Sequence, residues 1–235
     1  MLMDSLQSNV LGENTLAVWR ALTISVIMLL EICFIVVLAI GVAALFWFMV
    51  RQSSEKIVRQ YRQIAQQLQL DLTEPTPQLA GFIRAEPFMH GVYRLREISI
   101  SVPGKGLQNT RQIETIIKVK VDDESLTWQI TTKGLLGGLR QRDSGSKLRW
   151  LSGDSLLDAA IDVRTNDGLQ FARIFHHDRL ALLSKALKGS KATIALRGGV
   201  LSFAEFGLIA EDAKRERFLE MAELICDVAE AVEGR

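Results

Sequence analysis

The stretch ALTISVIMLLEICFIVVLAIGVAALFWFMV, residues 21–50, decides the architecture of this chain. Glu31 is its only charged residue. A helix of this length measures about 45 Å, whereas a bilayer's hydrocarbon core is about 30 Å thick. The apolar core of a cleaved signal peptide is shorter, about 7–15 residues. We therefore expect a single tilted transmembrane helix over residues 21–50, after a short tail over residues 1–20.

The basic residues that flank the apolar stretch predict its orientation. Arg20 is the one basic residue before it, whereas Arg51, Lys56, Arg59 and Arg62 follow it closely. Because basic flanks stay in the cytoplasm, the N-terminus is expected outside and the C-terminal part in the cytoplasm. We also expect these four residues to contact anionic lipid headgroups or a partner.

Glu31 conflicts with a lone helix in lipid. Placing Glu31 at the membrane boundary leaves the apolar residues 21–30 protruding, and burying those residues brings a costly charge into hydrocarbon. A second transmembrane helix, from a membrane-protein partner or another copy of the chain, resolves both problems. Small residues allow close approach of such a helix; they are Ala39, Gly41, Ala43 and Ala44. The alternative is a Glu31 that reaches the interface or is protonated and needs no partner.

Composition narrows the classes of function. The chain has 235 residues, a formal net charge of +1 and a pI near 7.8, so nucleic-acid binding is not expected. Cys33 lies in the apolar stretch and Cys226 near the end, so a disulfide between them is not expected. A reducing cytoplasmic setting fits this cysteine usage.

Hydrophobic periodicity predicts an α+β domain behind the anchor. Residues 51–72 are expected to form a juxtamembrane amphipathic helix, and residues 73–235 the cytoplasmic domain. Alternation predicts strands over 97–102, 113–121 and 126–130, paired in sequence as hairpins. Further predictions are an extended segment over 155–163, a broken helix over 170–187, a hairpin over 191–203 and a last helix over 210–232. Runs of strands and helices without βαβ alternation favour an antiparallel sheet with packed helices.

The segment GDSLLDAAIDVRTND, residues 153–167, carries a resemblance. It resembles an F-[DE]-x-x-F-x-V signature of bacterial membrane-anchored families of unknown function, with Leu157, Asp158, Ile161 and Val163 at the signature positions. Aliphatic residues replace both phenylalanines. The resemblance implies N-terminal transmembrane sequence, a C-terminal α+β domain and a bacterial inner membrane, but no activity.

Candidate chemistry is sparse. Asp154 and Asp158 form a speculative acidic site, because paired carboxylates can exchange protons or bind a cation; a capped, solvent-facing strand explains them equally well. Adjacent His176 and His177 point about 100° apart on a helix, which disfavours a shared metal. With no nucleotide loop and no nucleophile motif, we expect no cofactor and no metal, and leave enzyme activity undecided.

Residues 133–150 mix basic and apolar side chains. The basic ones are Lys133, Arg140, Arg142, Lys147 and Arg149, and Trp150 ends the segment. Such a mixture suits an anionic membrane surface or an acidic protein partner, and a solvated loop with buried leucines is the alternative.

Three functional hypotheses remain. The first is a membrane-anchored accessory or scaffold subunit that acts through its anchor, its basic segment and its acidic last helix. The second is a membrane-tethered ligand sensor or enzyme using the acidic residues of 154–167. The third is a binder of anionic lipid surfaces.

Overall fold

The computed structural model describes residues 2–74, 76, 87–102, 114–133, 147–187, 190 and 192–234, with side chains from Met28 onward except Ala186. The chain divides into two units, Met1–Gln52 and Ser53–Arg235. Helix α1 (Leu2–Leu68) makes up the first unit and continues into the second, an α+β domain.

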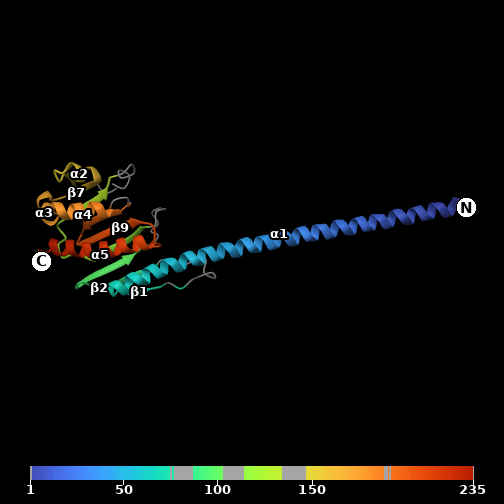
Figure 1. Ribbon diagram of the computed structural model, residues 1–235, viewed down its shortest axis with the longest axis horizontal. Helices are drawn as coiled ribbons and strands as arrows, with labels where there is room; N and C mark the ends of the chain where they lie inside the picture. The colour runs from blue at the N-terminus through green and yellow to red at the C-terminus, as the bar shows by residue number, and fades with distance from the viewer. Residues whose placement is uncertain are drawn as a thin grey trace. The chain divides into compact units, whose positions relative to one another are not determined.

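The domain is built on one antiparallel sheet, with nine strands in the part of the chain that the structure describes (Figure 1). The strands are β1 (Asp71–Thr73), β2 (Phe88–Tyr93), β3 (Arg96–Ser101), β4 (Glu114–Lys120), β5 (Trp128–Thr132), β6 (Leu148–Trp150), β7 (Ile161–Thr165), β8 (Ala192–Arg197) and β9 (Val200–Phe206). Their order across the sheet is β1-β2-β3-β4-β9-β8-β5-β7-β6. The predicted α+β class with an antiparallel sheet is confirmed.

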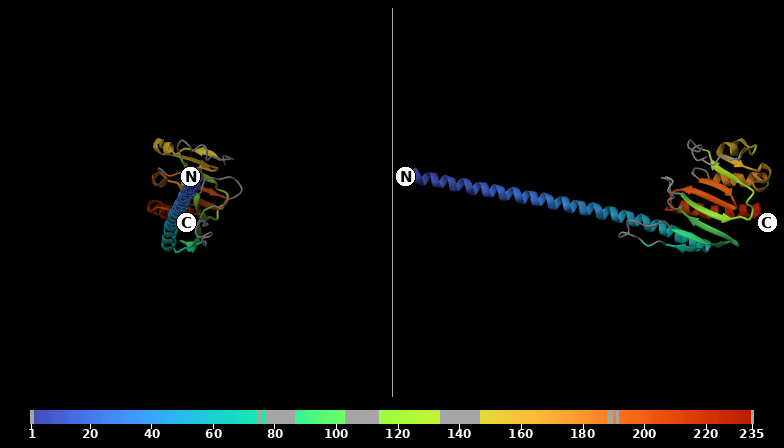
Figure 2. Two further views of the ribbon diagram at one scale, coloured as in Figure 1. Left: turned by 90° about the vertical axis from the view of Figure 1, so that its right-hand side faces the viewer. Right: turned by 180° about the vertical axis from the view of Figure 1, so that it is seen from behind.

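Helices pack on one face of this sheet. They are the last turns of α1, α3 (Gly168–Ile174), α4 (His177–Leu187) and α5 (Asp212–Val232), with the short α2 (Ser155–Ala160) beside β7 and α4. Trp128 of β5 meets Phe171 and Phe175 edge to face. Figure 2 (right) shows the sheet from the other side, with helices behind the strands.

Alternation along the strands separates the two faces. In β4, Ile117 and Val119 are buried, whereas Lys118 and Lys120 are exposed. Successive side chains of a strand point to opposite faces, so the buried ones meet the helices. The apolar stripe predicted for the last helix is likewise buried in α5, from Phe218 to Ala229. Burial raises the pKa of the Cys226 thiol on this helix to about 11.

Two glycines allow the tight β8–β9 turn to pack against β4. Gly198 and Gly199 have φ angles of 53° and 68°. A Cβ on Gly199 would lie 2.8 Å from the carbonyl oxygen of Val121, whose amide donates to the Gly199 carbonyl. The predicted hairpin is confirmed, and only glycine fits this close approach.

The β2–β3 hairpin is fastened to the end of α5 by ion pairs. Arg94 contacts Asp227 and Glu230, and Arg96 donates to both carboxylate oxygens of Glu233 at 2.8 and 2.6 Å. The side chains of Arg96 and Glu233 are each 7% exposed, so this pair is buried.

Two local expectations were wrong. Residues 155–160 form α2 rather than a strand, because the Asp154 carboxylate accepts from the amides of Leu156 and Leu157 and caps a helix. Strands β4 and β5 do not pair; β4 pairs with β3 and β9, and β5 with β8 and β7. Residues 53–68, the last part of α1, belong to the domain, since Tyr61, Ile64 and Leu68 are buried in its core.

Candidate functional site

The first candidate surface is the apolar part of α1. From Met28 this helix is long and apolar enough to cross a membrane. Glu31 and the predicted contact residues Ala39, Gly41, Ala43 and Ala44 are exposed. A Cβ on Gly41 would meet no atom within 4 Å among the described residues, so a neighbouring helix has room to approach.

The basic residues after the anchor separate into different environments. The Arg51 guanidinium lies 5.4 Å from the ring centroid of Trp47. Arg62 pairs with Glu74, with its Nη2 2.7 Å from Oε2. Lys56 and Arg59 line a polar pocket of about 500 Å³ beside the start of α5.

The predicted basic segment 133–150 is described only at its ends, and Arg140 and Arg142 lie outside the described residues. Lys133 donates to the Asp158 carbonyl oxygen. Lys147 is half-buried and precedes the edge strand β6. In β6, Arg149 lies 3.5 Å from Asp162, and Trp150 packs on Phe171 with ring centroids 5.0 Å apart. Trp150 therefore helps to close the core.

The acidic residues near α2 have local structural partners. Asp154 lies 2.9 Å from His177 Nε2, and Asp158 accepts from the amide and hydroxyl of Ser152. The His177 contact and the helix amides lower the pKa of Asp154, the Ser152 amide lowers that of Asp158, and Asp154 raises the pKa of His177. Across the described residues, no group of three or more His, Cys, Asp or Glu side chains is placed to hold a metal ion. An acidic site at Asp154 and Asp158 stays a prediction.

Sequence reasoning missed the face of the sheet that the described helices leave uncovered, here called the open face. Direct register partners form a row across eight strands of this face: His90, Ser99, Lys118, Ser202, Ala195, Gln129, Arg164 and Arg149. The neighbouring partners Ile116, Ala204, Thr193 and Thr131 extend it. Small side chains at the centre of a water-facing sheet were a signal in the sequence, but it could be interpreted only once the strand order was known.

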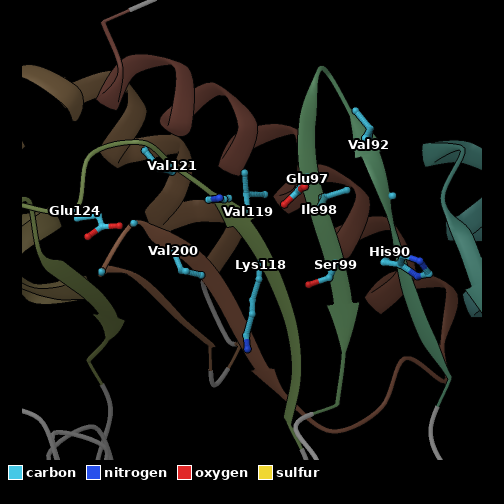
Figure 3. Close-up of a pocket in the computed structure, with 14 residues that line it drawn as sticks. His90, Val92, Glu97, Ile98, Ser99, Lys118, Val119, Val121, Glu124 and Val200 are labelled. Atoms are coloured by element: carbon cyan, nitrogen blue, oxygen red, sulfur yellow. The ribbon is translucent and has the colours of Figure 1, made fainter.

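A groove of about 530 Å³ runs over β2, β3, β4 and β9 on the open face. Figure 3 shows His90, Ser99 and Lys118 on neighbouring strands, with Val200 beside Lys118. Glu97 and Glu124 also line the groove. Lys118 and Lys120 form no ion pair with any residue in the described ranges. The groove thus combines small and apolar side chains with two lysines and two glutamates, and the β3–β4 register places Glu97 opposite Lys120.

Comparison with known proteins gives a likeness of fold only. No family model and no curated protein matches the sequence. The crystal structure of the mycobacterial trehalose monomycolate transport factor A, TtfA, is similar, with a TM-score of 0.50 and 10% identity. The match covers 75% of this chain and 94% of that one.

Proposed function

We propose that this chain is a single-pass, membrane-anchored accessory or scaffold subunit of a protein complex in a bacterial inner membrane. Its N-terminus lies outside and its α+β domain lies in the cytoplasm. It acts through protein–protein and membrane-surface contacts rather than through chemistry of its own.

The observation that carries this proposal is the exposed apolar helix with Glu31 in it. An ionised carboxylate in hydrocarbon costs at least about 2.5 kcal/mol unless it finds a partner. Ala39 and Ala43, four residues apart, match the small-residue spacing of packed membrane helices. A neighbouring helix with a basic or polar side chain satisfies both features.

The acidic residues near α2 have structural partners, which supports a role without catalysis. Asp154 caps helix α2 and contacts His177, and Asp158 accepts a hydrogen bond from Ser152. The likeness of fold is to a protein named as a transport factor, and we extend the proposal to a complex that carries out transport.

The test is gentle extraction of the full chain from native membranes, followed by native sizing and mass spectrometry. We expect a stoichiometric membrane-protein partner that is lost in Glu31→Leu and retained in the matched control Cys33→Leu. A lone monomer in the wild type contradicts the proposal. An oligomer of this chain alone contradicts a complex with a different protein. In that case the transmembrane helix would serve for self-association.

Binding to an anionic lipid surface is a second candidate function. Leu148 is 76% exposed beside Arg149, and Leu151 follows closely with 60% exposure. Vesicle flotation tests this hypothesis: reversing the charge of Arg140, Arg142 and Arg149 is expected to release the soluble domain from anionic vesicles. Unchanged flotation counts against it.

A further inference from the structure

We propose that the polar pocket between residues 56–63 of α1 and the start of α5 binds the zwitterionic phosphoethanolamine headgroup of a membrane phospholipid. Lys56 and Arg59 contact the phosphate of this headgroup, and Glu211 contacts its ammonium group. The inference rests on the membrane anchoring in the proposed function and names a ligand for its membrane-surface contacts. It does not depend on Glu31 or on a protein partner.

One face of α1 forms the first wall of the pocket. The lining residues Lys56, Arg59, Gln60 and Gln63 are spaced at three and four residues, so their side chains lie on one side of the helix. Gln60 is only 8% exposed, and its side-chain amide donates to Asp212 Oδ1 on α5 at 2.9 Å. This hydrogen bond fixes the wall against α5, so the pocket has a defined shape before a ligand binds.

The charged groups around the pocket are available to a ligand. Lys56, Arg59 and Glu211 are exposed and form no ion pair with any residue of the described ranges. Lys56 and Arg59 lie one helical turn apart, and an anion between these two like charges relieves their repulsion. Glu211 occupies the N-cap position of α5, yet its carboxylate makes no capping hydrogen bond. The carboxylate is therefore not required by its own helix.

The pocket carries both signs of charge, which favours a zwitterion over an anion or a cation alone. Hydrogen bonding from Gln60 and the charge of Arg215 lower the pKa of Asp212, so this second carboxylate stays ionised at neutral pH. A phosphate accepts strong charge-assisted hydrogen bonds from lysine and arginine, and a primary ammonium group donates such bonds to carboxylates. A phosphoethanolamine group carries both partners close together. The pocket volume of about 500 Å³ lies within the range of small-ligand sites, about 300–1,000 Å³.

The position of the two cations along α1 favours a lipid as the source of this group. Lys56 and Arg59 follow Val50, the last residue of the apolar stretch, by about 9 and 14 Å of helix. Headgroups add roughly 5–8 Å to each side of the hydrocarbon core. Side chains of a helix tilt toward its N-terminus, and long basic side chains extend toward the interface. Both cations can therefore reach the level of the headgroups.

The experiment is native mass spectrometry of the purified full chain in detergent, titrated with three dioleoyl lipids. They are phosphatidylethanolamine, phosphatidylcholine and phosphatidylglycerol, which differ only in their headgroups. The choline nitrogen has no N–H to donate, and phosphatidylglycerol has no ammonium group. We expect phosphatidylethanolamine to bind about tenfold more tightly than either other lipid, because only it completes the charge-assisted hydrogen bonds.

Variants assign this preference to the pocket. Lys56→Gln with Arg59→Gln is expected to weaken phosphatidylethanolamine binding about tenfold, because the phosphate loses both cations. Glu211→Gln is expected to abolish the preference over phosphatidylcholine and to leave the weaker binding that the two lipids share. All three residues are exposed, so the substitutions should be tolerated, and thermal melts must show that the variants fold like the wild type.

Matched controls exclude a general effect of charge. Arg173→Gln with Lys185→Gln makes the same change in net charge on exposed positions of α3 and α4. Glu220→Gln does so for Glu211 on an exposed position of α5. Both control variants are expected to bind the three lipids like the wild type.

Free O-phosphoethanolamine distinguishes a lipid from a soluble ligand. We expect it to displace phosphatidylethanolamine only at far higher concentrations than the lipid itself. Displacement at equal concentrations would make the free compound the ligand and overturn the assignment to a lipid. Equal binding of the three lipids, or a preference that persists in the pocket variants, overturns the inference as well.

The result is separable from the test of the accessory function, because the titration uses the purified chain. If native sizing finds a stoichiometric protein partner while the three lipids bind equally, the pocket inference is wrong and the accessory function stands. If the lipid preference is found and sizing finds no partner, the pocket inference stands and the accessory function is wrong.

Discussion

At the scale of single residues, the ion pairs of the domain differ in their exposure to water. Arg96 and Glu233 are shielded between the β2–β3 hairpin and the end of α5, whereas Arg62 and Glu74 lie at the surface. Screening by solvent makes exposed pairs weak, and desolvation makes the loss of one partner from a buried pair costly.

The buried pair gives the first prediction. Arg96→Ala leaves the Glu233 carboxylate buried without its counter-charge, so we expect the free energy of unfolding to fall by about 3 kcal/mol. Urea denaturation of residues 53–235 measures this change. Arg62→Ala is the control, for which we expect a much smaller change. Equal effects of the two substitutions would contradict the difference in burial.

His177 gives a pH-dependent prediction. The contact with Asp154 raises the pKa of His177, so the folded protein holds the proton more tightly than the unfolded chain. The stabilisation is present below the unfolded pKa and disappears as pH rises through the folded pKa of His177. NMR titration should give a pKa above about 6.5, the ordinary value for histidine. In Asp154→Asn it should move back toward that value; an unchanged titration would show that the contact does not persist in solution.

At the scale of elements, the end of α1 is part of the domain core. Tyr61, Ile64 and Leu68 are buried, and the Tyr61 hydroxyl lies 3.5 Å from Thr115 Oγ1 on β4. We therefore propose residues 53–235, rather than 73–235, as the unit that folds.

Truncation tests this boundary. Each large apolar side chain taken out of the core removes about 1.5–3 kcal/mol of burial, and three of them together approach the whole stability of a domain. Residues 53–235 should melt cooperatively by circular dichroism, and residues 73–235 should not. Equal melting temperatures would show that the helix end is dispensable.

Patterns within a short stretch of sequence predicted several strands, one turn and the last helix. Alternation in β3 and β4, the glycine turn after Arg197 and the stripe of α5 were all sufficient. The pairing of β4 with β9 joins strands about eighty residues apart in the chain, and no local pattern specifies it. The open face depends on that order, so its row of small residues could not be recognised in advance. Helix α2 was missed because Ser155–Ala160 is too short to show periodicity.

At the scale of the whole molecule, the proposed topology can be measured directly. With the N-terminus outside, green fluorescent protein fused after Arg235 should fluoresce, and alkaline phosphatase at the same position should be inactive. The opposite pattern would place the open face outside the cell and contradict a cytoplasmic partner.

Cys226 offers an intrinsic reporter of domain opening. The folded domain withholds this thiol from solvent and holds its pKa near 11, so it reacts with alkylating reagents only while α5 is detached. Once Cys33 is replaced by serine, the rate of alkylation of Cys226 measures how often α5 detaches from the sheet. This measurement needs no attached dye and can be made in intact membranes. A bound partner that holds the sheet and α5 together would lower the rate of Cys226 alkylation.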